Sequence, residues 1–205
     1  MEHLSKLFGS PARVKLLRLF LFNPDTPFDR SDVVSSARVT PDTASKELAA
    51  LSRAGVITRR TFYREVMRPG SRTPKKRKTL GYVLDRKYPY LSQLTAFMRD
   101  TLAVSEAEIR TRLRGVGTIK LIVLAGFLIT QERSALDLLL VGDKIDDSML
   151  RNVIRGLEAE CGKEIRYAVL HTEDYQYRKR VRDRLVREVL DFEHKEILNR
   201  LSTAV

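Results

Sequence analysis

Apolar residues recur at helical spacing in three consecutive segments near the start of the chain. Residues 10–24 are apolar around much of their circumference, and the pair Ser10-Pro11 is typical of a helix start. Residues 29–40 have a short apolar face, and residues 40–57 form the third segment. The pattern therefore predicts three helices. A tight connection between the last two makes them a helix-turn-helix.

The third segment has the clearest helical pattern. Ala44, Leu48 and Leu51 lie at positions i, i+4 and i+7, which predicts a stripe facing the core. Thr40 is expected to cap this helix and Gly55 to end it. The positions expected at its surface are Asp42, Thr43, Ser45, Lys46, Glu47 and Ala49.

Two β-strands are predicted directly after these helices. Residues 56–68 and 79–85 form the strands, and residues 69–78 form the tip, with Pro69-Gly70 marking the bend. Apolar residues alternate imperfectly along the first strand, so the pattern leaves the register open.

The positive charge of the chain is concentrated in this hairpin. The net charge is +12, and residues 51–90 hold 12 Lys and Arg against 2 Asp and Glu. A charge so localised indicates a polyanion as partner, because a solubilising surface usually mixes both signs. The basic run Lys75–Lys78 is also compatible with a nuclear localisation signal, but its place inside a hairpin favours nucleic-acid contact.

The stretch TPDTASKELAALSRAGVI, residues 40–57, followed by a basic hairpin, resembles the winged-helix transcriptional regulators of the ArsR and MarR type. The resemblance implies a DNA-binding domain over residues 1–88 whose partner is double-stranded DNA. In such a domain, the recognition helix at residues 41–54 enters the major groove. The basic wing at residues 56–85 then lies along the phosphate backbone or in the minor groove.

The residues expected to contact DNA in this arrangement are Thr40, Asp42, Thr43, Ser45, Lys46, Arg59, Arg60, Arg64, Arg72, Lys75, Lys76, Arg77 and Lys78. Thr43 and Lys46 are the strongest candidates for base edges or phosphates. For Asp42 and Ser45, helix-start chemistry without base contact is an equally good interpretation. Some arginines of the first strand are expected to be simply solvated.

Residues 89–116 are predicted to form a connector helix, because Leu91, Leu94, Phe97 and Leu102 follow helical spacing. Such a stripe packs either within its own chain or against a second copy. The second interpretation predicts a homodimer, which would bind a two-fold symmetric DNA site.

From residue 117 to residue 205, segments typical of strands and helices alternate. The predicted strands are residues 118–129, 135–143, 163–172 and 195–201. The predicted helices are residues 146–162 and 172–191. Together they indicate a small α/β unit, so the fold class expected for the whole chain is α+β.

The second of these strands lies in the stretch SALDLLLVGD, residues 134–143, which, with Gly126 before it, resembles a minimal nucleotidyltransferase domain. In that family a Gly-Ser pair positions the nucleotide phosphates, and an Asp-x-Asp pair with a third carboxylate binds two Mg²⁺ ions. Gly126 and Asp137 match this motif. Phe127 replaces the serine, and Ala135 replaces the first aspartate.

The third carboxylate is missing as well, since Arg166, Tyr167 and Ala168 occupy the candidate positions. One remaining carboxylate cannot hold two divalent ions at useful affinity. We therefore expect a degenerate domain that is not an enzyme, has no catalytic residue, and holds neither metal nor cofactor. Gly126 and Asp137 would then form a vestigial nucleotide pocket or serve the fold alone.

Taken together, the two halves of the chain resemble prokaryotic proteins that fuse a winged-helix regulator to a nucleotidyltransferase-like domain. They imply a transcriptional regulator whose second domain, a pseudoenzyme, is a sensor, dimerisation or partner module. Its effector, a small molecule or a protein, is unknown. Two alternatives stay open: an active nucleotidyltransferase guided to nucleic acid by its basic half, and an antitoxin-like nucleic-acid or protein interaction module.

Composition adds an expectation about location. No apolar run reaches the length of about eighteen residues that a membrane span needs, and the first residues lack an apolar signal core. Cys161, the single cysteine, cannot form an internal disulfide. A cytoplasmic protein without membrane contact is therefore expected.

Overall fold

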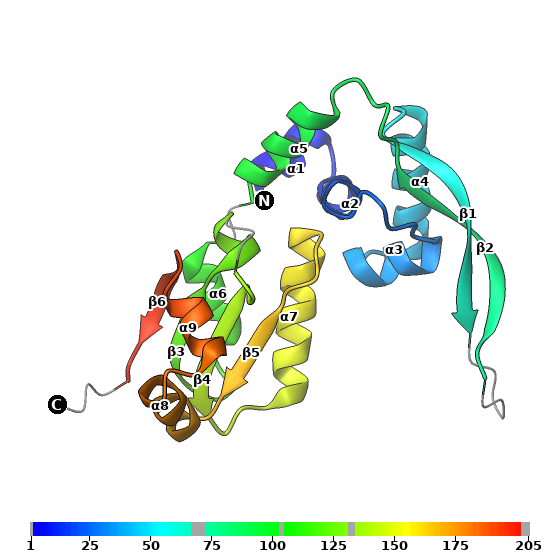
Figure 1. Ribbon diagram of the computed structural model, residues 1–205. Helices are drawn as coiled ribbons and strands as arrows, with labels where there is room; N and C mark the ends of the chain where they lie inside the picture. Colours follow the sequence, from blue (N-terminus) through cyan, green and yellow to red (C-terminus); the bar gives the residue numbers. More distant parts are fainter. Residues whose placement is uncertain (1, 67–72, 103–104, 131–133, 202–205) are drawn as a thin grey trace. The chain divides into compact units, whose positions relative to one another are not determined.

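The protein has a mixed α+β fold with two separate sheets (Figure 1). The computed structural model describes residues 2–66, 73–102, 105–130 and 134–201. The chain divides into two compact units, which we call unit 1 (residues 1–98 and 158–163) and unit 2 (residues 99–157 and 164–205). None of the helices in the described stretches is long and apolar enough to cross a membrane.

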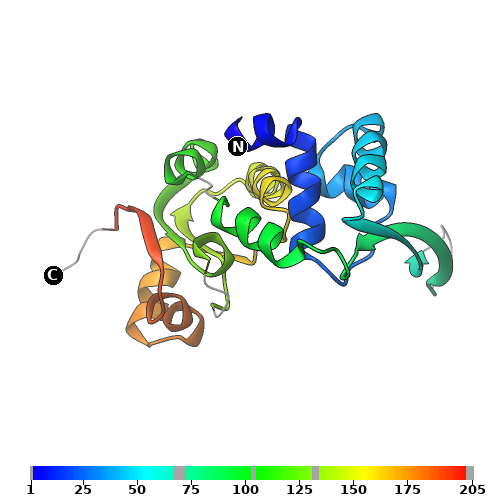
Figure 2. The same cartoon turned by 90° about the horizontal axis from the view of Figure 1, so that it is seen from above.

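Unit 1 begins with four helices, of which the last three pack together (Figures 1 and 2). Their bounds are α1 (Glu2–Phe8), α2 (Pro11–Phe22), α3 (Arg30–Ala37) and α4 (Pro41–Arg53). The three predicted helices are confirmed, including the caps: Ser10 accepts a hydrogen bond from Arg13 N, and Thr40 accepts one from Thr43 N. The apolar pattern does not predict α1, which is held by contacts of Leu4 and Phe8 with the core.

The core of unit 1 confirms the predicted stripe of α4 and corrects one position. Ala44, Leu48 and Leu51 are all buried in this core. Glu47, expected at the surface, is only 7% exposed. Its carboxylate accepts a hydrogen bond of 2.7 Å from Arg13 Nε, so the ion pair joins α2 to α4. Helical spacing alone does not reveal a partner 34 residues away.

After α4 the chain forms an antiparallel hairpin of two ten-residue strands, β1 (Ile57–Val66) and β2 (Lys75–Leu84). The predicted hairpin is present, but the predicted start of its return strand is wrong, because residues 75–78 belong to β2 and not to the tip. They pair with residues 63–66 in regular register. Four consecutive cations contain no alternation of apolar and polar residues, so the apolar pattern does not predict this part of the strand. Residues 69–72, with the predicted bend and Arg72, lie outside the described residues.

The base of the hairpin is attached to the helices of unit 1. Ile57 and Leu84 are buried in the core, and Phe28 forms a β-bridge with Tyr82. Phe28 N donates to Tyr82 O at 2.9 Å, and Tyr82 N donates to Phe28 O at 2.8 Å. The base is therefore fixed by both apolar burial and backbone hydrogen bonds.

The predicted single connector helix is wrong. The structure has two helices here, α5 (Leu91–Asp100) and α6 (Glu106–Leu113). Ser105 stands at the N-cap of α6 and Glu106 lies in its first turn, a combination typical of a helix start. The apolar residues continue past this helix start, so their spacing alone does not predict a boundary between two helices. Met98, on α5, is fully buried in the core of unit 1.

Unit 2 is built on a four-stranded sheet in the order β5-β4-β3-β6. The strands are β3 (Thr118–Leu124), β4 (Leu138–Asp143), β5 (Tyr167–Leu170) and β6 (Lys195–Asn199). Strand β4 is parallel to β5, while β3 is antiparallel to both β4 and β6.

Helices cover both faces of this sheet (Figure 1). On one face Leu138 and Leu140 of β4 pack with α6 and α7 (Asp147–Cys161). On the other face Leu139 and Val141 pack with α8 (Thr172–Arg180) and α9 (Arg184–Leu190). A strand buried on both faces needs a continuous apolar run, which explains the sequence of β4.

Each predicted strand of unit 2 is shorter than expected, and residues 135–143, 163–172 and 195–201 form only β4 (Leu138–Asp143), β5 (Tyr167–Leu170) and β6 (Lys195–Asn199). Two elements differ more. The predicted strand 118–129 ends at Leu124 and continues as a 3₁₀ helix, η1 (Gly126–Ile129). The predicted helix 172–191 is divided into α8 and α9, because Asp183 caps a new helix with a hydrogen bond from Leu185 N at 3.1 Å. In both places local cap and turn geometry overrides a continuous apolar pattern.

Candidate nucleic-acid interface

The exposed side of α4 carries a polar stripe. Asp42, Lys46, Ala49 and Arg53 recur at helical spacing, and all four are exposed. Lys46 takes part in no ion pair within the described ranges. Its ammonium group is therefore available to a ligand, and Asp42 shares the same surface.

The other predicted contacts of α4 are engaged within the helix start. Thr40 Oγ1 accepts from Thr43 N at 3.3 Å and donates to Thr43 Oγ1 at 2.8 Å. Ser45 Oγ donates to Pro41 O at 2.9 Å. For Thr40 and Ser45 these bonds match helix-start chemistry, whereas Thr43 keeps acceptor capacity on its half-buried hydroxyl.

The hairpin presents cations on both of its faces. Because side chains alternate along a strand, the register assigns every residue to one face. The cations of one face are Arg59, Lys76 and Lys78. The cations of the other face are Arg60, Lys75 and Arg77, together with Arg64, which is paired inside the fold. The six cations other than Arg64 are exposed, and none of them forms an ion pair with another described residue.

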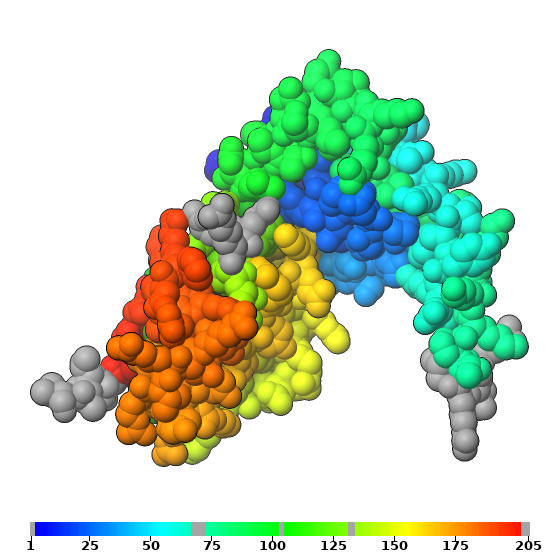
Figure 3. Space-filling model, viewed as in Figure 1, coloured from blue at the N-terminus to red at the C-terminus, as the bar shows by residue number. Residues whose placement is uncertain are grey.

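Beyond its base the hairpin leaves one face of β1 exposed, whereas Phe62, Arg64 and Val66 on the other face are half-buried, and the hairpin projects from unit 1 as a narrow ribbon (Figure 3). Tyr63 is 68% exposed and Leu80 is 58% exposed, and both share a face with Lys78. An isolated two-stranded ribbon is at best marginally stable in water. A ribbon that presents cations together with an aromatic side chain is suited to a partner that supplies both phosphates and apolar surface.

Arg64, a predicted DNA contact, is engaged inside the fold. Its guanidinium forms an ion pair with Asp29 at 3.3 Å and a second one with Asp32, the two residues of the capping box of α3. The hydrogen bond to Asp32 raises the pKa of Arg64 above its ordinary value. Arg64 therefore attaches β1 to α3, and no feature near Arg64 in the sequence signals this pair.

Gly81 makes the attachment of the hairpin possible. A Cβ atom at this position would lie 2.6 Å from Phe28 O and 2.7 Å from the Phe62 ring. We predict that Gly81→Ala lowers the free energy of unfolding by about 1–3 kcal/mol, the usual cost of overpacking. Urea unfolding at constant m-value measures the change. The neighbouring exposed change Leu80→Ala is the control, with an expected effect within about 0.5 kcal/mol. Equal midpoints for the two variants would contradict the close packing at Gly81.

In unit 2 the structure brings Gly126 and Asp137 together. Gly126 has a φ of +52°, and a Cβ atom there would overlap Asp137 Oδ1. Asp137 Oδ1 accepts from Phe127 N at 2.8 Å and from a terminal guanidinium nitrogen of Arg166 at 2.8 Å. Asp137 Oδ2 accepts from Arg166 N at 2.9 Å and Arg166 Nε at 3.0 Å. Gly126 and Asp137 are both predicted site residues, whereas Arg166 is not predicted to hold the carboxylate.

These four hydrogen bonds occupy the carboxylate of Asp137. The side chain is 1% exposed, so burial opposes ionisation, but the hydrogen bonds from Arg166 and Phe127 bring the pKa of Asp137 below its ordinary value. A carboxylate saturated by protein donors has little capacity left for a metal ion. Among the residues that the structure describes, no group of three or more His, Cys, Asp and Glu side chains is placed to hold one.

A second carboxylate of unit 2, Asp143, lies at the end of β4 in a surface cleft. It accepts from Thr172 Oγ1 at 2.8 Å and from Thr172 N at 3.2 Å, and Lys120 Nζ lies 3.0 Å away. These hydrogen bonds lower the pKa of Asp143 to about 2. Because Thr172 is the first residue of α8, the carboxylate stabilises the start of that helix.

Comparisons of the chain with protein-family models, with curated proteins and with solved structures find no significant match.

Proposed function

We propose that this protein is a transcriptional regulator that binds specific sites on double-stranded DNA through unit 1, acting as a winged-helix domain. One observation carries the proposal. A hairpin with six exposed cations, unpaired within the described residues, directly follows a helix-turn-helix whose second helix has an exposed polar stripe. These cations are concentrated in one hairpin and are not neutralised by ion pairs within the described residues, which indicates a polyanionic partner.

In this proposal α4 is the recognition helix and enters the major groove with its first turns toward the base edges. Lys46 donates to the acceptors of guanine, and the methyl group of Thr43 contacts thymine or its hydroxyl contacts a phosphate. Thr40 and Ser45 hold the helix start in shape rather than read bases, which agrees with their intrahelical hydrogen bonds.

The hairpin is the wing, and its two-sided charge suggests how it binds. A ribbon with cations on one face alone would suit a single phosphate backbone. Cations on both faces suit a ribbon that lies in a groove, where phosphates flank it on either side. Arg64 stays bound to α3 and sets the position of the wing relative to the recognition helix.

Unit 2 is proposed to be a module without nucleotidyl-transfer activity. Of the motif that the resemblance implies, only one carboxylate is present, and Arg166 and two backbone N–H groups already occupy it. Transfer of this kind depends on metal ions held by several carboxylates. Incubation with Mg²⁺ and a radiolabelled nucleoside triphosphate tests this point, and labelling of the protein or of nucleic acid would refute it.

Selection of bound sites from random double-stranded DNA tests the DNA-binding proposal. We predict that the unaltered protein enriches one motif and that Thr43→Ala/Lys46→Ala loses it, with a discrimination loss of about 1–3 kcal/mol per base contact removed. The matched control is Lys87→Ala/Ser92→Ala, which removes one lysine and one hydroxyl from exposed positions outside α4 and the hairpin.

The outcomes separate the candidate functions. A palindromic motif supports a homodimer, since protein and site would then share two-fold symmetry. Binding that is tight, equal for all sequences and strongly weakened by salt would refute sequence-specific recognition and favour a general nucleic-acid anchor.

A further inference from the structure

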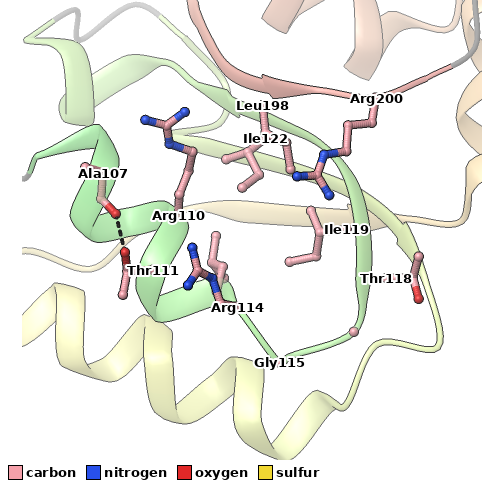
Figure 4. Close-up of a pocket in the computed structure, with 12 residues that line it drawn as sticks. Ala107, Arg110, Thr111, Arg114, Gly115, Thr118, Ile119, Ile122, Leu198 and Arg200 are labelled. Carbon is pink, nitrogen blue, oxygen red and sulfur yellow. Dashed lines mark hydrogen bonds between the residues drawn. The ribbon is translucent and has the colours of Figure 1, made fainter.

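Unit 2 contains a surface cavity of about 450 Å³ on the face of the sheet that α6 covers (Figure 4). Arg110 and Arg114 of α6 line one side of it, and Arg200, just after β6, lines the other. Ile119 and Ile122 of β3 and Leu198 of β6 form an apolar wall. No Asp or Glu is among the lining residues.

The fold brings these arginines together from distant parts of the sequence. Gly115, with a φ of +91°, turns the chain from the end of α6 into β3. Strand β3 pairs with β6, and Arg200 N extends this ladder by donating to Lys120 O at 2.6 Å. The pairing therefore places Arg200 beside β3, so that Arg114 and Arg200, from different elements, both line the cavity (Figure 4).

The charges in the cavity are not neutralised by the fold. Arg112, on the same helix, forms an ion pair with Glu108, whereas neither Arg110, Arg114 nor Arg200 has a carboxylate partner within the described part of the chain. Arg110 has one long hydrogen bond, 3.4 Å, to Ile197 O. A cavity lined by one sign of charge concentrates counter-ions, and guanidinium groups match phosphate oxygens in geometry.

We propose that this cavity binds a small organic phosphate. The phosphate group lies between Arg114 and Arg200, with Arg110 beside it, and the carbon body contacts Ile119, Ile122 and Leu198. The cavity volume lies in the range of ligand sites. The carbonyl end of α6 disfavours an anion, but a helix end contributes less than charge-assisted hydrogen bonds from guanidinium groups. The site is separate from the Gly126–Asp137 pair and does not depend on DNA binding.

Calorimetric titration of the full chain with phenyl phosphate, in the absence of DNA, tests the proposal. We expect saturable binding with a Kd of about 1 mM or lower. Arg114→Gln/Arg200→Gln is expected to weaken it about tenfold or more, because two charge-assisted contacts are lost. The matched control is Arg151→Gln/Arg155→Gln, two exposed arginines of α7 outside the cavity, with an expected Kd within about twofold of the original.

A second pair of measurements tests the apolar wall. Inorganic phosphate is expected to bind more weakly than phenyl phosphate, and Ile119→Ala to weaken phenyl phosphate severalfold without affecting inorganic phosphate. Equal affinities for the two probes would overturn an organic ligand. Absence of saturation, or equal binding by all variants, would overturn the site itself. If Arg114→Gln/Arg200→Gln instead weakens only duplex binding, the arginines extend the DNA surface and the proposal fails.

Discussion

Replacing Lys75, Lys76, Arg77 and Lys78 together with glutamine is expected to lower the affinity for duplex DNA by about 10²–10⁴-fold near 0.1 M salt. Each cation that neutralises a phosphate contributes about 0.9 to the slope of log K against log salt concentration, so the slope should fall by about 3–4. The structure supports a contribution from all four residues, because they are exposed and lie on a regular strand, two on each face. Fluorescence anisotropy over a salt series measures both quantities.

The matched control for this variant removes the same charge elsewhere. Arg151, Arg155, Arg184 and Arg187 are exposed residues of α7 and α9. Their replacement with glutamine is expected to change the salt slope by less than about 1. Equal losses for both quadruple variants would show that net charge, and not the wing, drives binding.

Each face of the wing can also be tested alone. Arg59→Gln/Lys76→Gln/Lys78→Gln and Arg60→Gln/Lys75→Gln/Arg77→Gln remove the same charge from opposite faces. Similar losses would support a ribbon that lies in a groove. A loss for one face alone would indicate a ribbon that lies flat on one phosphate backbone.

Replacing Asp137 with asparagine is expected to lower the free energy of unfolding by about 2–4 kcal/mol. The amide has one accepting oxygen instead of two, and its NH2 group faces N–H donors, so two of the four donors lose their acceptor. The expected cost stays below that of a fully buried ion pair because the side chain of Arg166 is half exposed and regains water. Urea unfolding measures the change.

The control is Asp191→Asn, which breaks the Asp191–Arg187 pair on an exposed helix surface and should cost less than about 1 kcal/mol. The difference between the unaltered protein and Asp137→Asn should also depend on pH. Because the pKa of Asp137 is lowered in the folded state, its stabilisation is complete above the ordinary value of about 4 and is lost as pH falls through the folded pKa. A difference that grows on acidification would contradict the ionised, hydrogen-bonded carboxylate.

Local signals explain why part of the fold is predictable from the chain alone. The pairs Ser10-Pro11 and Thr40-Pro41 mark helix starts, and both carry the capping hydrogen bonds that this chemistry requires. Where such signals compete with an apolar pattern, the local signal determines the boundary. Ser105 and Asp183 each begin a new helix inside a segment whose apolar residues predict one continuous element.

The sequence by itself determined helices α2, α3 and α4, the basic hairpin, and the buried strand β4, because caps, charge density and apolar runs act over a few neighbouring residues. Only the tertiary structure decided which charged groups are free and which are engaged. Arg64 is held by Asp32, and Asp137 by Arg166, through pairs about 30 residues apart. Arg114 and Arg200 line one cavity because β3 pairs with β6. Such contacts depend on strand order and register, which are set by burial across the whole sheet and leave no local pattern in the chain.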